Sequence, residues 1–255
     1  MIDVHAHMND ARFDEDRAAV LEALKQGGIK RLINSGCCLA SCKDTLQMAQ
    51  ENDYIYAAIG IHPQEADELE QGGQEAWAQL KEMLAQPKVV ALGEIGLDYY
   101  YENSPREVQK KWFDAQLTLA EELDLPVVIH SRDAMRDTLE ILKKHPNNRG
   151  IFHCYSGSVE SLQEILKMGW SISLGGVVTF KNARVAKEVA AAVPLDRLML
   201  ETDSPYLAPE PNRGKRNCAL NLPYVAKMIA ELKGITPEEV ERITDENAMK
   251  MFKME

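Results

Sequence analysis

The sequence of 255 residues has no long hydrophobic run. No stretch in it approaches the length of a transmembrane helix, which needs roughly 18 consecutive apolar residues. It also lacks the basic segment and apolar segment of a secretory signal, so we expect no such signal. Linkers, low-complexity tracts and repeats of the solenoid kind are absent as well. These absences exclude a membrane-spanning protein and a repeat array, and they favour a globular protein without a membrane partner.

Cysteine is scarce, with five residues in the chain: Cys37, Cys38, Cys42, Cys154 and Cys218. An odd number of cysteines in a long chain without a signal predicts reduced thiols and not a disulfide framework. We therefore expect a cytoplasmic protein.

Positive charge is also in short supply, because 29 lysines and arginines stand against 40 aspartates and glutamates, for a net charge of −11. Proteins that coat nucleic acid need a broad basic face, so this balance argues against that class. A local phosphate site stays compatible with the balance, because bound divalent metals supply positive charge where the side chains supply negative charge.

What the sequence does contain is a regular alternation of short apolar runs and amphipathic stretches. The runs predicted as strands are Ile2–His7, Arg31–Ser35, Ile55–His62, Val89–Asp98, Val127–Ser131, Ile151–Tyr155, Ser171–Val178 and Leu198–Asp203. The stretches predicted as helices are Asp14–Lys25, Cys42–Asn52, Gln74–Leu84, Pro105–Leu123, Ala134–Lys144, Val159–Met168 and Ala183–Ala192.

Strand–helix repetition indicates a parallel sheet with helical crossovers, and eight predicted strands favour a closed barrel. We therefore predict an α/β fold, a (β/α)₈ TIM barrel with extra closing helices at the C-terminus, over Leu222–Leu232 and Pro237–Phe252. Residues 1–255 are predicted to form a single domain, because barrels of this length routinely do so.

Five of the predicted strands end in side chains that can bind a metal. They lie in the segments Asp3–His7, Gly93–Asp98, Ile129–Arg132, Phe152–Tyr155 and Leu200–Asp203. In a strand, residues i and i+2 share a face, so His5 and His7 project together. The carboxyl ends of barrel strands meet at one mouth, which brings four histidines and two carboxylates toward one another.

Imidazole and carboxylate groups suit zinc, manganese and similar divalent ions, and burying them without a partner or a metal is costly. A single histidine at a strand end is usually a core or surface residue. Four histidines and two carboxylates at the same end of alternating strands are hard to explain by a structural role alone. The predicted metal ligands are His5, His7, Glu94, His130, His153 and Asp203.

These motifs resemble those of the TatD-type metal-dependent deoxyribonucleases, a family related to the amidohydrolases. The similarity covers essentially the whole chain. It rests on the segments Asp3–His7, Gly60–Pro63, Gly93–Tyr99, His130–Arg132, His153–Gly157 and Glu201–Leu207. Together these motifs are highly specific.

The resemblance implies two divalent metal ions, of zinc, manganese, magnesium or nickel. It implies that His5 and His7 hold one ion and that His130 and His153 hold the other. Glu94 would bridge the two ions, at the place where related barrels often carry a carboxylated lysine.

The resemblance also implies a role and an activity. Asp203 is similar to the aspartate that binds metal and accepts the proton of the attacking water. The implied activity is hydrolysis of phosphodiester bonds in DNA, at the ends of single strands. One segment departs from the family's pattern, because Arg213–Asn217 leads into Cys218-Ala219 where members commonly have a Glu-Pro or Gln-Pro pair. That departure concerns substrate preference and not metal binding.

Three further residues near the predicted mouth are candidates for contacts with phosphate. His62 ends the third predicted strand and either contacts a phosphate or caps its own loop. The planar fork of Arg132 suits bidentate phosphate binding, with an ion pair to Asp133 as the alternative. Lys215 lies in the compact basic segment Arg213–Arg216, which is otherwise a solvated loop.

The segment Tyr99–Tyr101 directly follows the strand that carries Glu94. Its aromatic rings either stack on a base, as in proteins that bind single strands, or pack within their own loop.

The sequence therefore predicts a metal-dependent deoxyribonuclease that acts on DNA strand ends and has no obligate protein partner. The alternative within enzymes is an amidohydrolase-like deacylase or esterase that uses the same metals on a carbonyl group. A metal-binding module without turnover is the alternative from another class, and Asp203 argues against it because such a module needs no general base.

Overall fold

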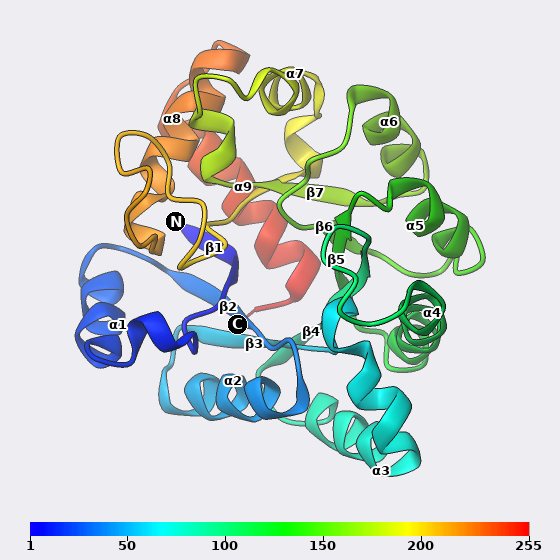
Figure 1. The fold of residues 1–255 in the computed structure, drawn as a ribbon. Helices are drawn as coiled ribbons and strands as arrows, with labels where there is room; N and C mark the ends of the chain where they lie inside the picture. The colour runs from blue at the N-terminus through cyan, green and yellow to red at the C-terminus, as the bar shows by residue number, and fades with distance from the viewer. Residues whose placement is uncertain (255) are drawn as a thin grey trace. The chain divides into compact units, whose positions relative to one another are not determined.

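The structure is a computed structural model that describes residues 1–254, and Glu255 lies outside the described residues. In the described part, eight parallel strands follow one another in chain order, and a helix follows each strand (Figure 1). The strands are β1 (Ile2–Ala6), β2 (Arg31–Ser35), β3 (Ile55–Ile59), β4 (Val89–Asp98), β5 (Val127–Arg132), β6 (Gly150–Phe152), β7 (Ser171–Leu174) and β8 (Leu198–Leu200). This order confirms the predicted (β/α)₈ barrel.

The α-helices begin and end close to the predicted positions. They are α1 (Arg17–Gln26), α2 (Leu39–Glu51), α3 (Ala66–Leu84), α4 (Arg106–Glu122), α5 (Met135–Leu142), α6 (Val159–Lys167), α7 (Arg184–Ala192), α8 (Leu222–Lys233) and α9 (Pro237–Phe252). Short 3₁₀ helices are η1 (Ala11–Phe13), η2 (Pro63–Glu65), η3 (Gly176–Thr179), η4 (Leu195–Arg197) and η5 (Ala219–Asn221). Because α8 follows β8 as the eighth barrel helix, α9 is the extra closing helix.

Helix α3 is the clearest departure among the helices, because it begins at Ala66 and not at the predicted Gln74. The prediction began the helix too late because Gly73, with a φ of 54°, interrupts the helix immediately before Gln74. The preceding turns carry Gly72 and several charged residues, so the apolar period becomes regular only after the interruption.

The described chain divides into two compact units. The first comprises residues 1–34, 153–167 and those from 171 onward, and the second comprises residues 35–152 and 168–170. Each unit brings together strand ends that carry predicted site residues.

In the first unit, β1 pairs with β2 and β7 pairs with β8. The ends of β1 and β8 are joined as well, because the Asp203 amide donates to the His5 carbonyl at 2.9 Å. The His7 amide likewise donates to the Ser204 carbonyl at 2.7 Å. Helix α9 packs against both β1 and β8. These contacts fix the chain where the first and last strands deliver predicted ligands.

In the second unit, β4 pairs with β3 and β5, and β5 pairs with β6. The Val127, Val128 and Ile129 side chains are fully buried, as expected for a strand covered on both faces. Gly96 of β4 lies opposite His130 of β5 and has a φ of 146°. A Cβ atom there would lie 1.9 Å from the His130 carbonyl oxygen, so this close approach requires glycine.

Several strands end earlier than predicted. Strand β6 stops at Phe152 and β8 stops at Leu200, and shortly after these ends Cys154 and Asp203 have positive φ angles of 42° and 56°. A residue in the left-handed region cannot continue a strand. The chain after β7 likewise turns into η3. His153 and Asp203 therefore lie on loops just beyond their strands.

Among the described helices, none is long and apolar enough to cross a membrane. The cytoplasmic location and the single domain over residues 1–255 stay predictions.

Candidate active site

The first unit gathers His5, His7 and Asp203 at the ends of β1 and β8. The His5 and His7 Nε2 atoms lie 3.1 Å apart, as expected for two side chains on one face of a strand. The Asp203 Oδ1 atom lies 3.7 Å from His5 Nε2 and 3.5 Å from His7 Nε2. Two imidazole nitrogens and a carboxylate oxygen therefore point toward one place.

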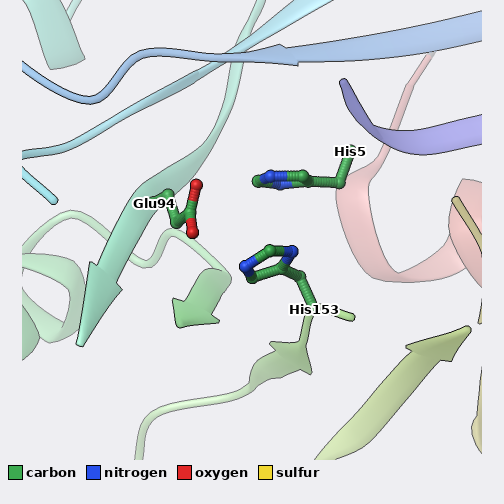
Figure 2. Close-up of side chains that lie close together, drawn as sticks. All are labelled: His5, Glu94 and His153. Carbon is green, nitrogen blue, oxygen red and sulfur yellow. The ribbon is translucent and has the colours of Figure 1, made fainter. Parts of the chain in front are cut away.

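His153 joins the same group from the loop after β6. Its ring stacks on the His5 ring, with centroids 4.0 Å apart and an interplanar angle of 26° (Figure 2). Behind it lies Glu201, which is fully buried and whose Oε1 atom is 3.7 Å from His153 Nδ1. The other Glu201 oxygen accepts a hydrogen bond from the Ser173 hydroxyl. A carboxylate behind an imidazole is the usual means of orienting a metal-binding histidine.

The protonation state of Asp203 follows from these neighbours. Burial by itself would raise the pKa of Asp203, but the hydrogen bond with His7 and the charges of His5 and His153 lower it below its ordinary value. Asp203 is therefore ionised at neutral pH, which is the state that can bind a cation or accept a proton.

The second unit gathers Glu94, His130 and His62. Glu94 is buried on β4 (Figure 2), and its Oε1 atom lies 2.7 Å from His130 Nδ1 and 3.5 Å from His62 Nε2. The His62 and His130 ring centroids are 4.5 Å apart. The predicted ligands Glu94 and His130 thus lie together with the predicted phosphate residue His62.

His62 combines the two roles that the sequence left open. Its Nδ1 atom accepts the Gln64 amide at 3.1 Å and so caps the loop that begins η2. Its Nε2 atom is directed toward Glu94. Burial lowers the pKa of His62, and the charge of Glu94 opposes this only in part. The ring is therefore neutral at neutral pH.

Asp98 completes this second group, although it is not among the predicted ligands. Its Oδ2 atom lies 3.1 Å from His130 Nε2 and accepts a hydrogen bond from the Gln64 amide group at 2.8 Å. Burial would raise the pKa of Asp98, but the hydrogen bonds from His130 and Gln64 lower it well below its ordinary range. Since Glu94 and Asp98 are four residues apart on one strand, alternation could have identified Asp98.

Asp3 is a further buried carboxylate that the sequence left without a role. Its Oδ1 atom accepts the backbone amides of Thr202 and His5 at 3.0 and 3.3 Å, so it ties β1 to the end of β8. Burial raises the pKa of Asp3 to about 7, although the Thr202 hydroxyl opposes the shift. Asp3 and Glu201 support the ligand-bearing loops from behind.

Both groups fit divalent cations by the chemistry of their donors. The ligand atoms of His5, His7 and Asp203 lie within 4.8 Å of one another, as do those of His62, Asp98 and His130. Imidazole nitrogens with carboxylate oxygens are the ligand set of zinc, manganese and related ions. Within each group, burying several polar side chains together is costly without a cation.

The remaining predicted contacts lie outside the two groups. The Arg132 guanidinium stacks on Tyr100, and in the described part of the chain Arg132 has no ion pair, with Asp133 or otherwise. Lys215 is exposed. Of its basic segment, Arg216 instead forms a two-pronged contact with Asp16, with N···O distances of 2.8 and 2.6 Å.

Similarity to known proteins identifies the family of this chain. The sequence matches the family described as TatD related DNase over residues 2–253. The chain belongs to the TatD family. The Bacillus subtilis (strain 168) protein named "Uncharacterized metal-dependent hydrolase YabD" is 44% identical to it, with 100% of this chain and 99% of that protein covered.

Two further TatD-family proteins show the extent of the similarity. The protein named "3'-5' ssDNA/RNA exonuclease TatD" from Rahnella sp. (strain Y9602) is 34% identical over 99% of this chain and 98% of its own length. The crystal structure of YJJV, a TatD homologue from Escherichia coli K12, has a TM-score of 0.91 and 31% identity, covering 100% of this chain and 98% of that one. The protein is accordingly a metal-dependent hydrolase of the TatD family.

Proposed function

We propose that this hydrolase cleaves phosphodiester bonds at the ends of single-stranded DNA, with two divalent metal ions as cofactors. The observation that carries the proposal is the pair of largely buried imidazole–carboxylate groups, one in each unit, in which His5 and Asp98 are fully buried and the others partly exposed. Both groups lie at the carboxyl ends of barrel strands. That end of the strands is where barrel enzymes carry their active sites. The Rahnella relative, whose name describes an exonuclease for single-stranded DNA and RNA, supports the choice of substrate.

The proposed ligands are those predicted from the sequence. His5 and His7 would hold one ion, His130 and His153 the other, and Glu94 would bridge them. When bound, divalent ions in such sites lower the pKa of water from about 15.7 toward 7 and stabilise the charge that develops on the phosphoryl group.

The protein's own contribution begins with Asp203, which is both a proposed ligand and the proposed general base. Because its pKa is low, its carboxylate is ionised and available to accept the proton of the attacking water. The contacts of Asp203 with His5 and His7 hold that carboxylate beside the ligands. The proton of the attacking water would thus pass to the Asp203 carboxylate.

Three side chains are proposed to contact phosphate oxygens: His62, Arg132 and Lys215. His62 lies beside Glu94 and presents Nε2 there. Arg132 keeps its guanidinium at the carboxyl end of β5, stacked on tyrosine and not engaged by a carboxylate among the described residues. Lys215 is an exposed cation on the loop after β8. His62 would act as a neutral donor, and two local cations, Arg132 and Lys215, suit a strand end better than a long duplex.

The test offers the metal-loaded protein end-labelled single-stranded DNA, the matching RNA and a panel of acyl esters and amides, each with Mn²⁺, Mg²⁺ or Zn²⁺. We expect nucleotide release from DNA with at least one metal and no acyl hydrolysis. The variant Lys215→Ala should raise KM for DNA several-fold, whereas Lys43→Ala, at an exposed lysine of α2, should not. Acyl hydrolysis without nucleotide release under any metal would establish a deacylase or esterase instead.

A further inference from the structure

We propose that Tyr100 and Tyr101, together with Arg132, form a stacking site for the unpaired bases of a single-stranded nucleic acid. The proposal rests on the proposed function, because it places the strand beside the group around His130. It also divides the Tyr99–Tyr101 segment into one residue that packs and two that bind.

The three tyrosines differ in their surroundings. Tyr99 is half-buried, its hydroxyl donates to Asp137 Oδ2 at 2.7 Å, and the Arg106 guanidinium covers its ring at 4.2 Å. Tyr100 and Tyr101 are 58% and 56% exposed, which are the two highest exposures among the large hydrophobic residues that the structure describes. Loop packing therefore explains Tyr99 but not its two neighbours.

The exposed rings form an ordered group with a cation. The Tyr100 and Tyr101 centroids are 4.7 Å apart at an interplanar angle of 86°. The Arg132 Cζ atom lies 3.9 Å from the Tyr100 centroid and 4.9 Å from the Tyr101 centroid. The guanidinium thus holds the rings in place by a cation–π contact and adds a positive charge beside them.

Aromatic rings interleaved with a cation are what proteins use to bind single strands, because the rings stack on bases while the cation attracts the backbone phosphate. In a duplex the faces of the bases are already stacked on one another and offer no free surface. Every base has a π-face, so this site should accept any sequence. The occupant that fits is therefore an unpaired stretch of DNA or RNA.

Asp98 connects the stacking site to the group around His130. Its Oδ1 atom accepts the Tyr100 and Tyr101 backbone amides at 2.9 and 3.2 Å. Its Oδ2 atom lies 3.1 Å from His130 Nε2. Arg132 lies two residues after His130 and opposite Asp98 in the β4–β5 register. One carboxylate therefore holds both the tyrosines and a proposed metal ligand, so a base stacked on them has its phosphate near the reaction site.

The first test measures binding to the metal-loaded protein without turnover. The probe is a short phosphorothioate-linked DNA, which resists hydrolysis, with 2-aminopurine near one end. We expect stacking to quench its fluorescence and Tyr100→Ala/Tyr101→Ala to weaken binding by roughly tenfold to a hundredfold. The double variant Tyr100→Phe/Tyr101→Phe, which keeps the rings, should restore both quenching and affinity. Tyr224→Ala removes a tyrosine of α8 that is 41% exposed and should change neither.

The second test separates this proposal from the proposed function by comparing hydrolysis of normal DNA with that of an oligonucleotide lacking bases at its end. We expect the double alanine variant to raise KM on normal DNA while leaving the abasic rate at its wild-type value. Wild-type protein that binds and quenches the probe but hydrolyses neither substrate contradicts the proposed function alone. Hydrolysis and binding that are unchanged in the double alanine variant overturn the stacking site alone.

Discussion

Asp98 lies with its Oδ2 atom 3.1 Å from His130 Nε2, and this contact fixes a ring whose Nδ1 atom is 2.7 Å from Glu94. Carboxylates that orient metal-binding histidines fix the direction of the ring and raise its basicity, and so contribute to metal affinity. Asp98 is fully buried, and hydrogen bonds from Gln64 and from the Tyr100 and Tyr101 amides hold its carboxylate in place.

Asp98→Asn should therefore weaken metal binding by roughly tenfold to a hundredfold, because the amide replaces a charged partner of His130 with a neutral one. The affinity is read by calorimetric titration of metal into the metal-free protein. Asp137→Asn is the control, since Asp137 contacts Tyr99 and Lys110 but no proposed ligand. Equal metal affinities for the Asp98→Asn variant and the wild type would show that Asp98 does not contribute to metal binding.

Gly96→Ala should lower the free energy of unfolding by roughly 3 kcal/mol or more, or prevent folding, because the new Cβ would collide with the His130 carbonyl. Gly169→Ala is a matched comparison, since Gly169 also has a positive φ of 86° but nothing lies near its Cβ position. That variant should cost only about 1–2 kcal/mol. The free energies of unfolding are measured by urea titration of both variants. Similar reductions in the two would contradict the proposed crowding at His130.

The Cys42 thiol should resist alkylation in the folded protein. Burial raises the pKa of Cys42 far above its ordinary value, and its Sγ atom donates to the Gly60 carbonyl at 3.3 Å. Treatment with iodoacetamide at pH 8 should modify the half-exposed Cys38 and leave Cys42 unmodified, as peptide mass spectrometry would show. In denatured protein both should react. Modification of Cys42 at the rate of Cys38 under native conditions would speak against its burial.

An ion-pair network on α9 should make stability depend on pH. Glu241 accepts Lys30 Nζ at 3.0 Å, and although burial would raise the pKa of Glu241, this contact lowers it below its ordinary value of 4.5. A carboxylate with a depressed pKa stabilises the fold above 4.5, and this contribution is lost as the pH falls through the folded value.

Glu241→Gln should consequently reduce the free energy of unfolding at pH 7 by less than about 1 kcal/mol, since the pair is partly exposed and screened by solvent. The difference from wild type should disappear in urea titrations well below pH 4.5. Glu231→Gln, at an exposed glutamate of α8 with no ion pair among the described residues, serves as control and should show no such trend. A constant difference across the pH range would exclude the ionic explanation.

The parts of the site that the sequence could predict are those that depend on local period. The i, i+2 spacing of His5 and His7 suffices to place both imidazoles together, because a strand fixes their direction. The barrel itself follows from the repeated alternation of strands and helices. The residues at which strands end were harder to predict, because the pattern of apolar residues does not indicate the left-handed turns at Cys154 and Asp203.

Contacts between distant segments could not be predicted in the same way. Arg216 is engaged by Asp16, two hundred positions away in the chain, and no spacing in the sequence reveals that pair. The adjacent tyrosines Tyr99, Tyr100 and Tyr101 are chemically identical, so only the fold separates the packed ring from the exposed ones. Local chemistry thus identified the candidate ligands, while tertiary packing decided their partners.

The most direct test of the proposed metal-dependent nuclease is the rate of nucleotide release from end-labelled single-stranded DNA, measured for wild type and Asp203→Asn before and after metal removal by a chelator. The wild type should lose activity with the metal and regain it when Mn²⁺, Mg²⁺ or Zn²⁺ is restored. Asp203→Asn should stay folded and be slower by roughly a hundredfold to ten-thousandfold with every metal, because it lacks the proton acceptor. Activity that survives metal removal, or an Asp203→Asn rate equal to that of the wild type, would contradict the proposal.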